Sequence, residues 1–313
     1  MEIKALLKLL TQIIYILCGL VSISTGIRGL KNEKAKIGTF LFWTILGIIF
    51  IFGEAIPYKV TGGLLVILAI ITVTKQLHIG KFENISSQFK IAQSEKLKNK
   101  IFIPAVLIGI AAFLILQFKI GKTAIPPALG IGGGSLVALL AAAIIIKPKF
   151  SETNEDTSKL LMQIGATAIL PQLLAALGAV FTKAGVGKVI AASISSVVPT
   201  GNIFIGIVIY AIGMVIFTMI MGNAFAAFSV ITAGIGIPFI IKNGGNPAII
   251  GALGMTAGYC GTLMTPMAAN FNIVPASILE IKDKYGIIKV QAPMALLLLV
   301  THVMLMLLLF GVK

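Results

Sequence analysis

Charge is the property that this sequence has least of. Charged residues make up 11% of its 313 positions, and from Val189 to Leu279 the only one is Lys242. A soluble domain carries roughly 25% charged residues. Hydrophobic residues make up 58% of the chain, and the mean hydropathy is +1.06. A composition this apolar excludes an ordinary soluble domain and indicates a protein that resides in a lipid bilayer.

Arginine, cysteine and histidine are also scarce. Arg28 is the single arginine, so the net charge of +15 does not indicate a nucleic-acid surface; the lysines lie mostly between apolar segments, where they orient the protein and contact anionic lipid. Cys18 and Cys260 lie in apolar segments and predict no disulfide framework. His78 and His302 are isolated, and no Walker A motif or intramembrane aspartate pair is present. We therefore expect no bound metal, no cofactor and no enzymatic activity.

Apolar runs of membrane-spanning length are plentiful instead. A spanning helix needs about 20 residues, so 313 positions leave room for about ten spans. The first run, Ala5 to Ile27, shows no small-residue cleavage site and is predicted to be an uncleaved helix. The fold class expected is an all-α integral membrane protein with broken helices and at least one re-entrant hairpin. The expected segments are Leu9–Ile27, Ile37–Ala55, Val60–Thr74, Ile101–Phe118, Thr123–Ile146, Leu160–Phe181, Ile203–Met221, Ala224–Ile241, Ala248–Thr265, Phe271–Leu279 and Ala292–Phe310.

Polar stretches suggest how the chain is divided. Residues 147–159 include SETNEDTSK and are predicted to be a solvated cytoplasmic linker. The linker separates a five-span part, residues 1–146, from a Gly-rich part, residues 160–313, and both can belong to one membrane domain. The run GIGGGS at Gly130–Ser135 predicts close helix packing, with a flexible point in a moving helix as an alternative. Glu54 is predicted to be an interface anchor or the partner of a lysine, with a proton-coupling carboxylate as the alternative.

The C-terminal half combines apolar sequence with helix breakers and small polar groups. Met221–Pro238 reads MGNAFAAFSVITAGIGIP, and Gly254–Pro275 reads GMTAGYCGTLMTPMAANFNIVP. Lipid-exposed backbone must be helical, because an unpaired N–H or C=O in hydrocarbon costs several kcal/mol. Glycine, proline and asparagine at this density resist continuous helix. The broken backbone is therefore expected to face protein or a water-filled cavity, which is typical of a transporter's binding site.

A carboxylate can bind at such breaks without a charged side chain. Half-helix N-termini present free N–H groups and the positive end of the helix dipole. Asn and Thr side chains add hydrogen-bond donors and acceptors, and neighbouring glycines let the backbone approach a ligand. The alternative is that these polar groups only hold helices together. The predicted substrate-binding residues are Asn223, Thr262, Thr265 and Asn270, then Gln172 and Ser229, with Gly222, Gly258 and Gly261 allowing backbone approach.

Four patterns together carry a family resemblance. They are IGTFLFWTILGIIFIFGEAIP, AILPQLLAALGAVFTKAGVGKVIA, MGNAFAAFSVITAGIGIP and GYCGTLMTPMAANFNIVP. They resemble a bacterial membrane family, formerly of unknown function, that supplies one subunit of a two-subunit 5-oxoproline (pyroglutamate) transporter. That family is similar to the ion transporter superfamily of gluconate, citrate and dicarboxylate permeases. The resemblance implies inverted repeats, with Gly185–Ile190 in a re-entrant hairpin and Gly222–Pro238 in the broken helix after it.

The resemblance also implies a function. We expect a multi-pass permease subunit in a bacterial cell membrane that carries out secondary transport of a small organic anion, foremost 5-oxoproline. The expected partner is a second membrane subunit of the same family, and the coupling ion is H⁺ or Na⁺. One alternative is a permease for another carboxylate, of the gluconate or dicarboxylate type. The other is a non-transporting membrane scaffold subunit, which needs small residues for packing but not repeated helix breaks.

Overall fold

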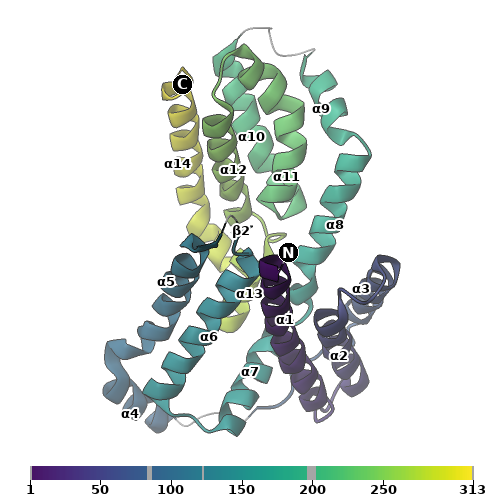
Figure 1. The fold of residues 1–313 in the computed structure, drawn as a ribbon, viewed down its shortest axis with the longest axis vertical. Helices are drawn as coiled ribbons and strands as arrows, with labels where there is room; N and C mark the ends of the chain where they lie inside the picture. The colour runs from purple at the N-terminus through teal and green to yellow at the C-terminus, as the bar shows by residue number, and fades with distance from the viewer. Residues whose placement is uncertain (1, 83–86, 122, 196–201, 312–313) are drawn as a thin grey trace. The chain divides into compact units, whose positions relative to one another are not determined.

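The computed structural model describes residues 2–82, 87–121, 123–195 and 202–311, which are largely helical (Figure 1). Six helices within these ranges are long and apolar enough to cross a membrane, and three further apolar helices are shorter. The all-α membrane class is therefore confirmed, whereas the count of about ten spans stays a prediction. The chain divides into two compact units, Met1–Gly165 and Ala166–Lys313.

The first unit holds the N-terminal helices and one short hairpin. Its elements are α1 (Glu2–Gly29), α2 (Lys36–Phe52), α3 (Tyr58–Val73), α4 (Ser87–Leu97), the 3₁₀ helix η1 (Lys98–Phe102), α5 (Ile103–Gln117), α6 (Pro127–Ile146) and α7 (Phe150–Ile164). Strands β1 (Lys119–Ile120) and β2 (Thr123–Ala124) pair antiparallel between α5 and α6. A 3₁₀ helix, η2 (Gly165–Ile169), leads into the second unit.

Glycines, which have no side chain, let the helices of the first unit pack closely. A Cβ on Gly19 of α1 would lie 2.7 Å from the carbonyl oxygen of Gly47 in α2, and a Cβ on Gly47 would lie 2.7 Å from that of Gly19. In α6, a Cβ on Gly130 would meet the Leu116 side chain, and one on Gly134 would lie 2.7 Å from the Ile108 carbonyl of α5. The packing interpretation of the GIGGGS run is thereby confirmed.

Ion pairs mark both ends of α1. The Lys8 ammonium lies 2.9 Å from the Glu54 carboxylate, and both side chains are mostly exposed, which confirms that Glu54 has a lysine partner. At the other end of α1, Arg28 pairs with Glu155 of α7 at 3.3 Å. The two charged pairs bracket the apolar length of the helix.

The region expected to be a solvated linker is helical from Phe150 onward. The Glu152 carboxylate accepts a hydrogen bond of 3.2 Å from the Lys149 N–H and places negative charge at the start of α7. The Ser24 hydroxyl of α1 donates to the Asn154 side chain at 2.9 Å. The polar composition here reflects a helix with one solvent-exposed face rather than an irregular segment. The boundary between the two units falls after Gly165.

The second unit holds the interrupted helices. Its elements are α8 (Leu170–Lys183), α9 (Val186–Ser195), α10 (Ile203–Met221), α11 (Ala224–Ile231), the π-helix η3 (Thr232–Ile240), the 3₁₀ helix η4 (Ile241–Asn243), α12 (Pro247–Leu263), α13 (Ala269–Ile278) and α14 (Gly286–Leu308). The core is formed by α10, α11, η3, α12 and α14, with Tyr210 and Met214 fully buried at its centre.

Two predicted irregularities take forms that differ from expectation. Gly185 turns the chain between α8 and α9 with φ of +73°, and α9 continues on from α8 in Figure 1 rather than folding back along it. The broken helix expected at Gly222–Pro238 has its break at the start, while its second half is a π-helix that includes Pro238, which has no N–H to donate. The Tyr210 hydroxyl shares a 2.8 Å hydrogen bond with that of Thr232, where the π-helix begins.

The first prediction concerns the Gly19–Gly47 contact. Gly47→Leu should lower the free energy of unfolding by about 1–3 kcal/mol, because the new side chain must push α1 away from α2. The measurement is unfolding of the detergent-purified protein by titration with sodium dodecyl sulfate, followed by circular dichroism. Gly63→Leu on α3 is the matched control, since a Cβ there meets nothing within 4 Å. Equal losses for the two variants would contradict the packing argument.

Candidate functional site

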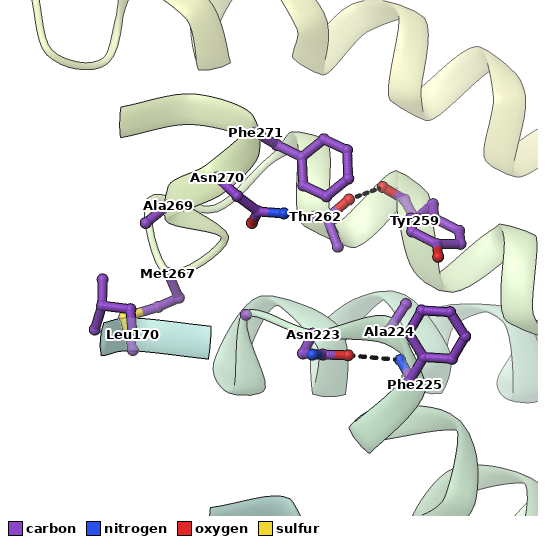
Figure 2. A pocket seen from close by; sticks show the side chains of 11 residues that line it. Leu170, Asn223, Ala224, Phe225, Tyr259, Thr262, Met267, Ala269, Asn270 and Phe271 are labelled. Atoms are coloured by element: carbon purple, nitrogen blue, oxygen red, sulfur yellow. Dashed lines mark hydrogen bonds between the residues drawn. The ribbon is translucent and has the colours of Figure 1, made fainter. Parts of the chain in front are cut away.

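A cavity of about 170 Å³ lies in the second unit, where two helix breaks face each other (Figure 2). One break separates α10 from α11, and the other separates α12 from α13. The residues that line the cavity are Leu170, Gly222, Asn223, Ala224, Phe225, Tyr259, Thr262, Met267, Ala269, Asn270 and Phe271. None of these side chains carries a charge.

The first break follows from the sequence Gly-Asn-Ala. Gly222 ends α10 with φ of +66°, a conformation that favours glycine, and its N–H donates to the Thr218 carbonyl at 2.7 Å. Asn223 is extended, and its Oδ1 accepts hydrogen bonds from the N–H groups of Phe225 at 2.9 Å and Ala226 at 3.4 Å. One residue thus ends a helix and the next caps the following helix.

The second break is held by buried side chains. The Thr265 hydroxyl donates to the Met219 carbonyl of α10 at 2.9 Å and accepts from the Met267 N–H at 3.2 Å. Asn272 is fully buried, and its Nδ2 donates to the Thr262 carbonyl at 2.8 Å and the Thr265 carbonyl at 2.7 Å. Thr265 therefore ties one break to the other, and Asn272 fixes the path of the chain between α12 and α13.

The starts of α11 and α13 both contribute to the cavity wall. Ala224 and Phe225 begin α11, and Ala269 and Asn270 begin α13. Ala268, which precedes α13, has no side-chain group that caps the helix. Each helix start carries a partial positive charge of roughly half an elementary charge. The cavity is therefore suited to an anion held by N–H groups.

Two asparagine amides add neutral donors at the same place. Because Asn223 uses its Oδ1 as the α11 cap, its Nδ2 is left on the opposite side of the amide (Figure 2). Asn270 is exposed, and its amide lies near Thr262 in Figure 2. Among the described residues, neither Asn223 Nδ2 nor the Asn270 amide has a hydrogen-bond partner. These groups are available to a ligand.

Of the nine predicted site residues, the structure brings four together at the cavity and leaves five outside its wall. Gly222, Asn223, Thr262 and Asn270 all line the cavity, although the Thr262 hydroxyl already donates to the Tyr259 carbonyl at 2.7 Å. Of the five that do not line it, Thr265 is buried, Gln172 and Ser229 are exposed, and the other two are glycines of α12. A binding role for any of these residues stays a prediction.

Gly258 and Gly261 serve helix packing in this structure. A Cβ on Gly258 would lie 2.8 Å from the Met214 side chain, and a Cβ on Gly261 would lie 2.5 Å from the Val215 carbonyl. Both contacts are with α10, and neither glycine lines the cavity. These two glycines bring α12 close to α10 and so hold the two breaks near each other.

Sequence reasoning missed the aromatic side chains of the site. Phe225 and Tyr259 meet edge to face with ring centroids 6.1 Å apart, and Tyr259 meets Phe271 in the same way at 6.3 Å. All three rings line the cavity. The search for polar groups at helix breaks passed over them, although Phe225 is the second residue of α11 and Phe271 is the third residue of α13.

The helices and their breaks define a multi-pass helical membrane protein. Within the described ranges, no three His, Cys, Asp or Glu side chains gather in a way that could hold a metal ion. The chain belongs to the family described as "Protein of unknown function (DUF979)", whose profile matches residues 12–310. No curated protein matches the chain, and no solved structure matches it either.

The second prediction concerns Asn272. Asn272→Ala should lower the free energy of unfolding by about 2–3 kcal/mol, because the Thr262 and Thr265 carbonyls lose their buried donor. Thermal unfolding in mild detergent measures the loss. Asn243→Ala is the control: Asn243 also donates to a carbonyl, that of Phe239, but is exposed, so water can replace it. A thermal midpoint that falls no further for Asn272→Ala than for Asn243→Ala would contradict this role.

Proposed function

We propose that this chain is a permease subunit that carries a small organic anion, foremost 5-oxoproline, across a bacterial cell membrane. The observation that carries the proposal is that two helix starts and the Nδ2 groups of Asn223 and Asn270, which have no partner among the described residues, meet at one cavity without charged side chains. Broken helices with N-termini that point at an anionic group are typical of transporter sites. A scaffold subunit has no use for this arrangement.

Neutral donors suit a transport site better than a fixed cation does. An arginine or lysine in a low-dielectric site binds a carboxylate strongly, and a carrier must release its substrate on the other side of the membrane. N–H groups and amides hold the same carboxylate through several weaker bonds. The lining side chains include no His, Cys, Asp, Glu or Lys, so none offers a strong base or a thiol, and we propose transport rather than catalysis.

The size and chemistry of the cavity support a compact ring compound. An engineered cavity of ~150 Å³ holds benzene, and the volume here is about 170 Å³. The carboxylate of 5-oxoproline would accept from the helix-start N–H groups. Its lactam N–H and C=O would pair with a side-chain amide such as that of Asn270, which offers both an acceptor and donors.

A second membrane subunit of the same family completes the proposal. The family resemblance supports such a partner. Much apolar surface on the first unit is also uncovered: within the described residues of α5, no side chain is buried. In this proposal the partner and lipid share that surface, and a gradient of H⁺ or Na⁺ drives transport.

Asn223 makes the third prediction. In proteoliposomes that hold the chain and its partner subunit, Asn223→Ala should weaken the affinity for labelled 5-oxoproline about ten- to hundredfold, because the anion loses a hydrogen-bond donor worth ~1–3 kcal/mol. Asn223→Asp keeps an oxygen to cap α11 but removes the Nδ2 donor and adds negative charge, so it should abolish uptake. The same uptake assay measures both variants, and Asn270→Ala should behave like Asn223→Ala.

Ser193→Ala is the control for these variants, since Ser193 lies on α9 and does not line the cavity. It should transport like the wild type. If Asn223→Ala and Asn270→Ala match it in affinity, the site lies elsewhere. If the wild type takes up no 5-oxoproline with or without the partner, the substrate assignment is wrong. Full uptake by the chain alone would contradict the need for a partner.

A further inference from the structure

Three aromatic rings form a continuous surface on one side of the cavity. We call Phe225, Tyr259 and Phe271 the aromatic wall. They come from three helices, α11, α12 and α13, and meet in sequence through the edge-to-face contacts at 6.1 and 6.3 Å. In Figure 2 the rings follow one another around one side of the view, and Asn223 and Asn270 approach from the other. The cavity therefore has one polar side and one aromatic side, on which the Tyr259 hydroxyl is the single polar side-chain group.

The wall has apolar area to offer a ligand. Phe225 is 63% exposed and Phe271 is 39% exposed, although both line the cavity. The face of an aromatic ring is negative, so a carboxylate is disfavoured over it, while an apolar group packs well against it. The wall and the helix starts thus orient a ligand in the same sense, with the carboxylate toward the N–H groups and the carbon skeleton toward the rings.

The polar side can satisfy only one charged group. Its donors are the N–H groups at the uncapped start of α13, the Ala224 N–H that begins α11, and the Nδ2 groups of Asn223 and Asn270. The N–H groups of Phe225 and Ala226 already donate to Asn223 Oδ1, and no lining side chain is cationic. A second carboxylate on the ligand would lie against the aromatic wall, where the Tyr259 hydroxyl is the only side-chain donor. The hydroxyl groups of a sugar acid would lie there too, and a buried polar group without a hydrogen bond is penalised.

We infer that the aromatic wall makes this site selective for monocarboxylates that carry an apolar or flat ring, against linear polyhydroxylated acids and dicarboxylates. The inference rests on the proposed function, since it assumes that the cavity binds an organic anion. It adds the residues that choose among anions, which lie opposite the residues that hold the carboxylate. Phe225, Tyr259 and Phe271 are specificity-determining residues in this scheme.

Four probes test the inference by calorimetric binding. They are 5-oxoproline, cyclopentanecarboxylate, gluconate and succinate. Each is titrated into the full chain, which is co-expressed with its partner subunit and purified in detergent. The wild type should bind both ring compounds at least about tenfold more tightly than gluconate or succinate, the effect expected of one unpaired buried polar group. Cyclopentanecarboxylate isolates the ring from the lactam.

Variants of the aromatic wall should change the preference for ring compounds over gluconate and should leave the binding of the carboxylate group unchanged. Phe225→Ser and Phe271→Ser should each reduce the gluconate-to-cyclopentanecarboxylate ratio of Kd values about five- to tenfold, mainly by weakening the ring compound. Phe225→Leu and Phe271→Leu keep the apolar bulk, so they remain measurable if a serine variant fails to fold, and should reduce the ratio less. Phe204→Leu is the control, because Phe204 is 58% exposed on α10 and does not line the cavity.

The outcomes separate this inference from the proposed function. A ratio that falls in the wall variants and stays unchanged in Phe204→Leu supports the inference. If the anions bind and Asn223→Ala weakens them, but the wall variants leave the ratio unchanged, the inference is overturned and the proposed function stands. Equal wild-type affinity for succinate and cyclopentanecarboxylate also overturns it. If no probe binds the wild type, the proposed function fails and the inference fails with it.

Discussion

The second unit depends on one constraint: backbone N–H and C=O groups at a helix break need partners, because water is scarce in an apolar interior. Asn223 supplies partners at the start of α11, and Asn272 supplies them for two carbonyls between α12 and α13. Thr265 joins the second break to the last turn of α10. An anion can bind the backbone N–H groups that these side chains leave unpaired, above all those at the uncapped start of α13.

Close helix packing brings together the unpaired polar groups at the two breaks. Gly258 and Gly261 let α12 approach α10, so that the breaks that follow both helices border one cavity. Thr265 and Asn272 hold the second break without lining the cavity, and Asn270 lines the cavity. Asn223 does both, because its Oδ1 caps α11 while its Nδ2 is left for a ligand. This division of roles explains how one short region can be both held in place and open to a ligand, and why losing Thr265 or Asn272 differs in kind from losing Asn270.

Some of this could be predicted from the sequence. The span Ile203–Met221 has the same bounds as α10, because Asn202 caps its start and Gly222 ends it in the left-handed conformation. The helix at Phe150–Ile164 was not predicted, since its polar composition resembles a linker until α1 gives it a surface to pack on. Asn270 and Asn272 could not be told apart, because only the fold decides which one is buried. The aromatic wall depends on contacts between three helices, and no spacing in the chain signals it.

The central claim is that the cavity between the two breaks is where the substrate binds, and protection of an introduced thiol tests it most directly. After replacement of the two native cysteines, Met267→Cys places a thiol in the lining at an exposed position that supplies no side-chain donor to the anion. With the partner subunit present, saturating 5-oxoproline should slow its reaction with a maleimide about tenfold, while Leu279→Cys, which is exposed outside the cavity, should react at an unchanged rate. Equal reaction rates for Met267→Cys with and without 5-oxoproline would contradict the account.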